Sequence, residues 1–402
     1  MLTTSCRLCN STDVAEVLDL GLHPLADTFL SESMLKKRQS YYPLGLVLCK
    51  NCGYVMSTYV VSPEERYQDT EYSYDSSNSP VAVKHFEEMA EQIAERTGLG
   101  TGDLAVDIGS NVGTLLAAIK AKTGASIIGV EPSANMAEAA EQNGVPTVAD
   151  FFGERAVSEI VKTSKAKVVS GTNVFNHIEG VQALMNNLDA VLTDDGQFVF
   201  ETPYLVELIE KDAFDTIYLE HVSYFSVRPH QEFFRTAGFY IYHLERNRYM
   251  GGSIRVFIGK DASKENKALI EEYCALEDSM QLRDEATFAA FARKVKDFKY
   301  ELCRSLYEIK AKGGSIVGVG AATKGNTLLN YCKIDSSLID SIADTSPLKI
   351  GKYTPGSCIK IIDEKDMDPN VEYVLILPWN IADFLKTKLT HLTKAQFIVP
   401  HM

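Results

Sequence analysis

The stretch DLAVDIGSNVGTLLAAIKAK, residues 103–122, decides the fold of this 402-residue chain. Its first part is an apolar run that ends at Gly109, as a buried strand does, and its last part has the composition of a helix. Between them lies a turn with glycine at positions 109 and 113. Glycine lets a backbone turn tightly and approach a ligand, and the N-terminus of the following helix offers free N–H groups. The stretch therefore predicts a strand, a ligand-binding turn and a helix.

The same alternation continues around this stretch. Before it, apolar residues at helical spacing predict a helix from Val81 to Arg96, ended by the glycines of 98–102. After it, NMAEAAEQNG predicts another helix, and further strands are predicted over 126–132, 146–152, 167–178 and 196–203. This rhythm of strand and helix predicts an α/β fold with a mostly parallel sheet covered by helices.

Acidic residues mark the ends of three successive predicted strands, where ligands bind in open α/β sheets. The first turn has the spacing D-x-G-x-N-x-G rather than the G-x-G-x-x-G of dinucleotide sites. Glu131, at the second strand end, suits a ribose diol; Asp150 and Phe151, at the third, suit the amino group and ring face of adenine. Each acid alone could be a helix cap or a solvated residue. Together they favour S-adenosylmethionine (SAM), and we expect it to contact Asp107, Gly109, Asn111, Gly113, Glu131, Asp150, Phe151 and Asn173.

Two Cys-x-x-Cys pairs stand near the N-terminus, Cys6 with Cys9 and Cys49 with Cys52. Four thiolates close a tetrahedral Zn²⁺ shell and leave no open position, so this spacing predicts a structural zinc site. Disulfides or two unrelated pairs are the alternatives. Residues 1–70 hold strand-like pieces such as Tyr42–Leu48 but few other apolar residues, so we expect the metal to help hold this domain together.

A second α/β pattern begins after residue 259. Residues 261–312 predict a long helical connection, and GSIVGVGAATKGNTLLNY predicts a strand, a glycine-rich turn and a helix. SIADTSP, CIKII and YVLILPW predict three further strands. We expect this turn to cradle the diphosphate of a nucleotide, with donors from Lys324, Asn326 and Thr327 and, from the preceding strand, Ser253 and Arg255. The alternative is that the turn binds a nicotinamide dinucleotide, with Asp344 at its ribose. From these patterns we expect three domains, over residues 1–70, 71–258 and 259–402.

The bulk composition excludes several classes of protein. A net charge of −14 without a long basic run argues against a nucleic-acid partner. No apolar stretch approaches the roughly 20 residues that span a membrane. The N-terminal sequence lacks the charged and apolar regions of a signal peptide, and paired thiols suit a reducing compartment. We expect a cytoplasmic monomer or weak homo-oligomer.

The order of motifs along nearly the whole chain resembles the SAM-dependent C-methyltransferases of nucleotide-activated 4-keto deoxysugars. The motifs are CxxC…CxxC, EYSYDSSNS, DIGSNVGTL, GVEPS, ADFF, NVFNHI, YLEHVSYFS, GGSIRVF and GAATKGNTLLNYC. The resemblance implies a zinc-binding N-terminal domain, a central class I methyltransferase domain with a Rossmann-like fold, and a C-terminal Rossmann-like α/β domain. It also implies methyl transfer to C3 of the sugar of a nucleotide-diphosphate sugar.

Methylating carbon requires a base that removes a proton beside a ketone and a group that stabilises the enolate. The resemblance places Tyr218, Glu220 and His221 in the sugar pocket with His221 as the base, and Glu220 would orient His221 or hold a sugar hydroxyl. His177 would polarise the carbonyl oxygen or relay a proton. From the residues alone, a core or exposed histidine and a helix cap are equally good interpretations of these positions.

The polar segment EYSYDSSNSP, residues 71–80, is expected to close over the methyl-donor site. Tyr72 or Tyr74 would lie near the sugar, and Ser76 and Ser77 would donate to the substrate; a plain surface turn is the alternative. Three other functions stay open on the sequence. They are an O- or N-methyltransferase of a nucleotide sugar, an NAD-dependent sugar-nucleotide reductase or epimerase, and a non-catalytic zinc scaffold.

Overall fold

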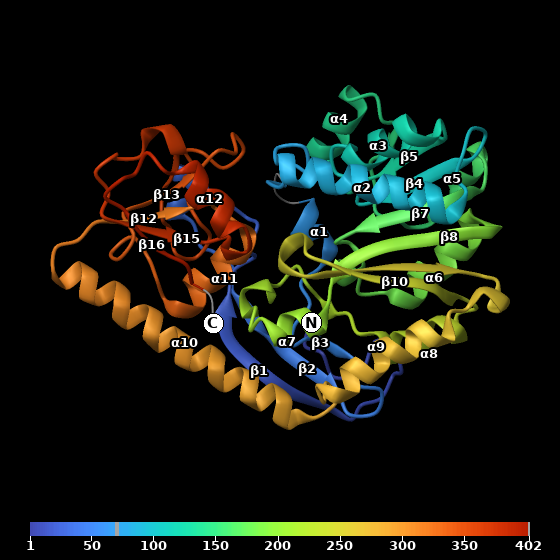
Figure 1. The fold of residues 1–402 in the computed structure, drawn as a ribbon, viewed down its shortest axis with the longest axis horizontal. Coiled ribbons are helices and arrows are strands. Elements are labelled where there is room, and N and C mark those ends of the chain that lie inside the picture. The colour runs from blue at the N-terminus through green and yellow to red at the C-terminus, as the bar shows by residue number, and fades with distance from the viewer. Residues whose placement is uncertain (69–71, 401–402) are drawn as a thin grey trace.

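The structure is a computed structural model that describes residues 1–68 and 72–400. Three sheets organise the chain, and each has helices or loops from neighbouring segments against it (Figure 1). Within the described ranges, none of the helices combines the length and the apolar character that crossing a bilayer requires.

The N-terminal sheet has four antiparallel strands in the order β1 (Val14–His23), β2 (Tyr42–Cys49), β3 (Val55–Ser57) and β9 (Ser223–Tyr224). The ten-residue strand β1 was not predicted. Register shifts between Glu16 and Leu18 and between Asp19 and Gly21 interrupt its alternation, because each bulge adds an unpaired residue. The last strand, β9, belongs to a segment about 170 residues further along the chain, so this sheet is built from two distant parts of the sequence.

The central sheet has seven strands in the order β10 (Tyr240–Asn247), β11 (Ser253–Gly259), β8 (Leu192–Pro203), β7 (Ala166–Thr172), β4 (Leu104–Ile108), β5 (Ser126–Val130) and β6 (Thr147–Val148). The strands from β8 to β6 pair in parallel, and β11 is antiparallel to both of its neighbours. All five residues of β4 are buried, which explains its unbroken apolar sequence.

Helices cover this sheet. They are α2 (Pro80–Thr97), α3 (Thr114–Thr123), α4 (Ala134–Gln142), α5 (Glu154–Thr163), α6 (Val181–Val191), α7 (Leu205–Glu210) and α8 (Val227–Thr236). α2 shows why they form. Ser79 caps its N-terminus through the amide of Ala82, Pro80 fits its first turn, and Gly98 ends it with φ of +66°.

The C-terminal sheet has five parallel strands in the order β14 (Ile361–Asp363), β13 (Ser341–Asp344), β12 (Ile316–Val319), β15 (Tyr373–Ile376) and β16 (Gln396–Ile398). Helix α11 (Thr323–Cys332) follows β12, and α12 (Ala382–Lys388) follows β15. The predicted helical connection is a pair of helices, α9 (Lys267–Ser279) and α10 (Glu285–Ala311). α10 runs from the N-terminal sheet to the C-terminal domain and packs on β1 and α11 (Figure 1).

One buried cluster joins the three regions. It includes Leu18 and Leu46 of the N-terminal sheet, Phe200 of the central sheet, and Leu328 and Leu375 of the C-terminal domain. Contrary to the expectation for residues 1–70, the N-terminal segment has enough apolar residues to form a core, but it buries them against the two neighbouring regions. A core shared in this way couples the stability of the three regions.

Candidate active site

The four predicted zinc ligands meet at the end of the N-terminal sheet. The Sγ atoms of Cys6, Cys9, Cys49 and Cys52 all lie within 4.8 Å of one another, and two Sγ–Sγ distances, Cys6 to Cys52 and Cys9 to Cys49, are 3.6 Å. A tetrahedral Zn²⁺ with Zn–S bonds of about 2.3 Å separates its sulfurs by about 3.8 Å. The four thiols therefore fit a structural zinc ion, and no position is left open for chemistry.

The zinc-bearing sheet directly supports the segment that carries His221. The Ser57 amide donates to the carbonyl of Val222 at 3.0 Å, and the Arg7 guanidinium donates to the same carbonyl. Strand β9 then pairs Ser223 with Met56. The N-terminal sheet thus positions the backbone directly after residues 217–221, which include His221.

The turn after β4 requires its glycines. Gly109 and Gly113 have φ of +64° and +83°, and a Cβ on either would lie 2.5–2.6 Å from a side-chain carbon of Val174 or Val145. The Asn111 amide donates to Glu131 Oε2 at 2.8 Å, so the acid at the end of β5 holds the turn. The structure therefore brings four of the expected SAM-binding residues and the expected ribose acid into one constellation.

The carboxylates of this constellation are poorly solvated. Burial raises the pKa of Asp107 to about 7, although Ser170 Oγ donates to its Oδ1 at 2.6 Å. Burial also raises the pKa of Glu131, which accepts backbone N–H groups from Asn111 and Ser133. A ligand that brings positive charge or hydroxyl donors would replace the solvation that these groups have lost.

The remaining residues assigned to SAM lie at the neighbouring strand ends. Asp150 follows β6, accepts the Phe151 amide at 2.8 Å and pairs with Arg155 at 3.4 Å. Asn173 follows β7 with φ of +55°, and its side-chain Oδ1 is buried without a hydrogen-bond partner in the part of the chain that the structure describes. An unsatisfied buried amide oxygen at this edge is compatible with a ligand that donates to it.

The tyrosine loop, residues 72–79, lies over this turn, with residue 71 outside the described ranges. The Ser76 amide donates to Asn111 Oδ1 at 3.0 Å, and Asn111 Nδ2 donates to the Tyr74 carbonyl at 2.9 Å. The Ser76 hydroxyl contacts the Thr114 hydroxyl, 2.8 Å away. The segment is thus docked on the expected donor site through Ser76. Ser77 is exposed, and its side chain donates to Asp75 Oδ1 at 2.7 Å.

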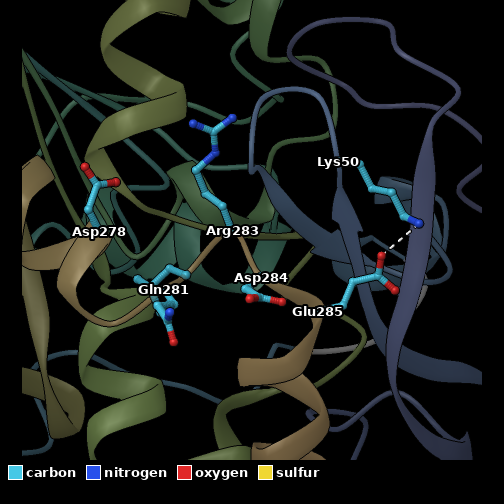
Figure 2. Close-up of a pocket in the computed structure, with 7 residues that line it drawn as sticks. Lys50, Asp278, Gln281, Arg283, Asp284 and Glu285 are labelled. Atoms are coloured by element: carbon cyan, nitrogen blue, oxygen red, sulfur yellow. Dashed lines mark ion pairs between the residues drawn. The ribbon is translucent and has the colours of Figure 1, made fainter.

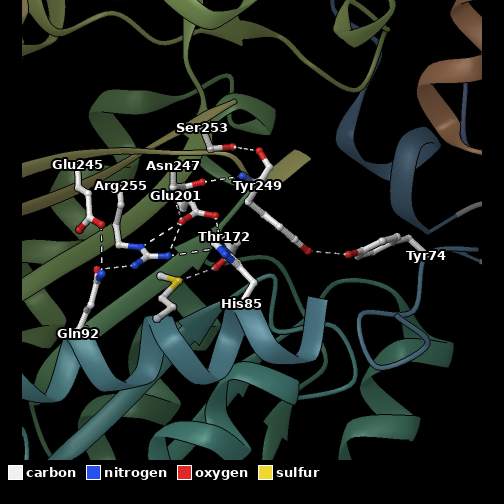
Figure 3. Close-up of polar contacts among 11 residues, drawn as sticks. Tyr74, His85, Gln92, Thr172, Glu201, Glu245, Asn247, Tyr249, Ser253 and Arg255 are labelled. Atoms are coloured by element: carbon white, nitrogen blue, oxygen red, sulfur yellow. Dashed lines mark hydrogen bonds and ion pairs between the residues drawn. The ribbon is translucent and has the colours of Figure 1, made fainter. Parts of the chain in front are cut away.

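The two tyrosines of this loop point to different places. The Tyr74 hydroxyl lies 3.2 Å from that of Tyr249 (Figure 3). The Tyr72 ring packs edge-on against Tyr67, 5.9 Å between ring centroids, and Tyr67 in turn hydrogen-bonds His177. Tyr72 is therefore the one that adjoins the predicted catalytic histidines.

His221 has a defined tautomer. Its Nδ1 lies 2.7 Å from the carbonyl oxygen of Thr216, which can only accept, so Nδ1 carries the proton and Nε2 keeps its lone pair. Its ring lies 3.8 Å from the Tyr218 ring and 4.9 Å from the His177 ring, between centroids. Burial lowers the pKa of His221 to about 3, so the imidazole is neutral at neutral pH.

His177 and the His221 segment are held by the end of the N-terminal region. Tyr67 hydrogen-bonds His177 Nδ1, and the buried Arg66 guanidinium donates to the carbonyls of His177 and Glu220 at 3.1 and 3.2 Å. Burial, together with the positive charge of Arg66, lowers the pKa of His177. Short helix α1 (Pro63–Tyr67) therefore positions both predicted catalytic segments.

Glu220 does not orient His221; the Thr216 carbonyl does. The Glu220 carboxylate instead accepts the Asp27 amide on Oε1 at 2.9 Å. Its Oε2 is buried without a hydrogen-bond partner in residues 1–68 and 72–400. Burial raises the pKa of this carboxyl to about 7. The second predicted role, holding a sugar hydroxyl, remains compatible with the free oxygen.

Two of the three C-terminal donors are engaged within the protein. Asn326 Nδ2 donates to the Ala26 carbonyl at 2.7 Å, and Thr327 Oγ1 donates to the Ile217 carbonyl at 3.1 Å. These bonds fix α11 against the other two regions, so the structure does not support a role for them as phosphate donors. Lys324 differs: its Nζ donates to the Met250 carbonyl at 3.4 Å over the Trp379 ring, and its charge contributes to the low pKa of His221.

The proposed phosphate ligand Arg255 lies in a buried polar network (Figure 3). Its guanidinium binds Glu201 Oε2 through Nε at 3.1 Å and Nη2 at 2.7 Å, and His85 Nε2 lies 2.6 Å from Glu201 Oε1. Arg255 is 3% exposed and Glu201 is fully buried, so removing either would strand a charge. The Ser253 hydroxyl, also buried, donates to the Tyr249 carbonyl at 3.0 Å. Both residues therefore have structural partners, contrary to the expectation that they contact substrate.

An open hollow of about 480 Å³ lies at the turn between α9 and α10 (Figure 2). Lys50, which stands between Cys49 and Cys52 in the sequence, is one of the residues that line it. Charged side chains line it, and Lys50 pairs with Glu285 across it at 2.8 Å. It contains none of the predicted catalytic, donor or substrate residues. A much smaller void does adjoin the site and is lined in part by Tyr218, Asn326 and Thr327.

The chain was compared with known proteins. Residues 6–67 match the family profile of a zinc binding domain, residues 83–244 that of a methyltransferase domain, and residues 248–401 that of a C-methyltransferase C-terminal domain. C-methyltransferase NovU of Streptomyces niveus is 32% identical over 380 residues, which cover 94% of this chain and 90% of NovU.

Solved methyltransferase structures resemble part of the chain. Magnesium protoporphyrin IX methyltransferase from Synechocystis PCC 6803 is 14% identical with a TM-score of 0.34, over 45% of this chain and 82% of that chain. Geranyl diphosphate C-methyltransferase from Streptomyces coelicolor A3(2) is 10% identical with a TM-score of 0.35, over 47% and 85%. Neither likeness is close enough to inform on substrate or mechanism. On its full-length relative and its three domain matches, the chain belongs to the family of SAM-dependent C-methyltransferases.

Proposed function

We propose that the protein methylates C3, the carbon beside the ketone, of a nucleotide-linked 4-keto deoxysugar through an enolate. The carbon acceptor follows from the family, and the sugar from the order of motifs along the chain. SAM supplies an electrophilic methyl group when it is bound. The observation that supports this chemistry best is the neutral His221 imidazole, whose Nδ1–H is held by the Thr216 carbonyl so that Nε2 is free to accept a proton.

Neighbouring groups suit the other requirements of the reaction. Burial keeps the pKa of Tyr218 well above its ordinary value, so its phenol stays protonated and can donate to a developing enolate oxygen. The free Glu220 Oε2 can accept a sugar hydroxyl. The turn after β4, with Glu131, would hold the donor beside the tyrosine loop.

A panel of nucleotide 4-keto sugars incubated with ¹³C-methyl SAM tests the proposal. We expect one member to gain a single labelled methyl, with the carbon–methyl coupling of a C–CH₃ group in its NMR spectrum. A methyl on oxygen or nitrogen, or no methylation of any member, would contradict it.

The base is tested separately with His221→Ala. Loss of a general base should lower the rate of transfer by about 10²–10⁴-fold. His391→Ala is the matched control, because His391 is exposed. Without SAM, wild-type protein should exchange the C3 proton with D₂O and His221→Ala should not; a variant that still exchanges at the wild-type rate means that His221 is not the base.

A further inference from the structure

Asp27 connects segments that the sequence keeps far apart. It follows β1 in the zinc-bearing N-terminal region, and it is 8% exposed. Its Oδ1 accepts the hydroxyl of Ser73 at 2.9 Å and the hydroxyl of Thr323 at 2.8 Å. Ser73 lies in the tyrosine loop, and Thr323 begins α11 beside Lys324. One carboxylate oxygen therefore ties the loop over the donor turn to the C-terminal domain.

The backbone of the same residue holds Glu220. The Asp27 amide donates to Glu220 Oε1 at 2.9 Å, while Glu220 Oε2 is buried and has no partner within the described ranges. A buried carboxylate that keeps one oxygen unsatisfied is costly unless a ligand completes it. The Asp27 amide thus fixes which oxygen of Glu220 is presented to the site.

We propose that Asp27 is a positioning residue for methyl transfer: its carboxylate joins the tyrosine loop to the C-terminal domain and thereby holds the Asp27 amide where it aims the free oxygen of Glu220. The inference rests on the proposed function, because it assigns Asp27 a part in that reaction. It gives the zinc-binding region a share in building the site rather than a scaffold role alone.

Alternatively, Asp27 could contribute only to stability. The two roles make different kinetic predictions, since a positioning residue acts on the reacting geometry and a structural one on the amount of folded protein. The variant Asp27→Asn keeps the size of the side chain and the backbone amide but weakens the acceptor that Ser73 and Thr323 share.

We expect Asp27→Asn to lower kcat about 100-fold, the scale of a misplacement near 1 Å, and to change KM for the nucleotide sugar by less than about threefold. SAM affinity should hold, because the contacts of the loop with Asn111 and Asn135 remain. Asp13→Asn is the matched control: Asp13 is an exposed acid of the same region, and its variant should keep the wild-type kcat.

Ser73→Ala and Thr323→Val each remove one arm of the connection and should each lower kcat about tenfold. If Thr323 acts through Asp27, the double variant Asp27→Asn/Thr323→Val should be no slower than Asp27→Asn. A wild-type kcat in Asp27→Asn overturns the proposal. So does a fall in kcat that merely follows the fraction of folded protein.

A second measurement needs no sugar substrate. In Asp27→Asn, amide hydrogen exchange of residues 72–79 and of the first turn of α11 should quicken at least tenfold, with unchanged exchange in β4. Unchanged exchange in both segments overturns the connection. If the wild-type protein methylates no sugar while this exchange result holds, the proposed function fails and the connection through Asp27 stands.

Discussion

The turn after β4 and the turn after β12 are alike in construction. Each follows a buried parallel strand and leads into a helix, and in each the acid at the end of the neighbouring strand accepts a turn amide. Glu131 accepts from Asn111 at 2.8 Å, and Asp344 accepts from Ala321 at 2.6 Å. By sequence pattern alone, either turn could bind a nucleotide.

The two turns differ in what surrounds them. Around the second, a Cβ on Gly320 would lie 2.6 Å from Pro378, and Lys349 donates to the Ala321 carbonyl at 2.9 Å. Around the first, polar groups of the tyrosine loop make the contacts, and Asp107 stands in the strand where β12 has Gly318. A glycine-rich turn is therefore a poor guide to a binding site until the residues that cover it are known.

Removing zinc should have the largest effect, and it should affect methyl transfer more than SAM binding at the first turn. Structural Zn²⁺ contributes about 10–16 kcal/mol to the folding of small domains, so chelation should unfold the N-terminal sheet and abolish methyl transfer. The first turn belongs to the central sheet, so SAM binding measured by calorimetry should weaken through the shared core but should not be abolished. Cys358→Ser, which changes a cysteine outside the cluster, should respond to chelator as the wild type does. Equal loss of SAM binding and transfer would show that the first turn depends on the metal.

Replacing the acid of each turn by alanine should show which turn binds SAM. Glu131→Ala should weaken SAM binding about 100-fold, because a buried carboxylate that binds hydroxyls contributes about 1.5–3 kcal/mol through each charge-assisted hydrogen bond. Asp344→Ala should leave the dissociation constant of SAM unchanged in the same titration. A reversed result would assign SAM to the C-terminal turn.

The two lysines near the second turn should behave differently. The charge of Lys324 acts on His221, so Lys324→Ala should raise KM for the nucleotide sugar about tenfold through loss of a charge-assisted contact. Lys349 is bound to the Ala321 carbonyl and lies over Phe29, so Lys349→Ala should lower the free energy of unfolding by about 1–2 kcal/mol. Steady-state kinetics and urea unfolding measure the two effects, and a KM change in Lys349→Ala alone would contradict the assignment.

The remaining prediction concerns pH. Asp107 has a folded-state pKa of about 7, raised by burial above its value in the unfolded chain. Between about pH 4 and pH 7 the folded protein binds a proton that the unfolded chain has lost, so this group makes stability fall as pH rises, by up to roughly 1.4 kcal/mol per pH unit. Asp107→Asn should remove that part of the slope in urea unfolding at several pH values. Parallel wild-type and variant curves would show that Asp107 does not titrate in this range.

Much of the fold can be predicted from local sequence patterns. The strand–turn–helix of 103–122 and the helix over 81–96 are predictable because their apolar spacing and their glycines lie within a few residues of one another. The helical connection over 261–312 is predictable from its charged residues and helix formers. The cysteine spacing predicts the thiol cluster for the same reason. Of the candidate site, the residues of the donor turn were predictable from their spacing, and the two histidines only through the resemblance to a known family.

The rest depends on partners distant in sequence. Arg255 was predicted to bind phosphate because its partner Glu201 is 54 residues away in the sequence. Asn326 binds a carbonyl 300 residues away, and Asp27 bears no motif that marks it as a junction. Such pairs have no local signature, since each residue is ordinary and only the folded arrangement joins them. Tyr67, Arg66 and Thr216 were overlooked on the same ground.

The pairing of β9 with β3 has a practical consequence for engineering. A swap of the methyltransferase module alone between related enzymes, to give a hybrid of new acceptor range, would leave the host's β3 to pair with a foreign strand. Productive chimaeras should transplant the zinc-bearing N-terminal sheet together with residues 217–224 as one unit.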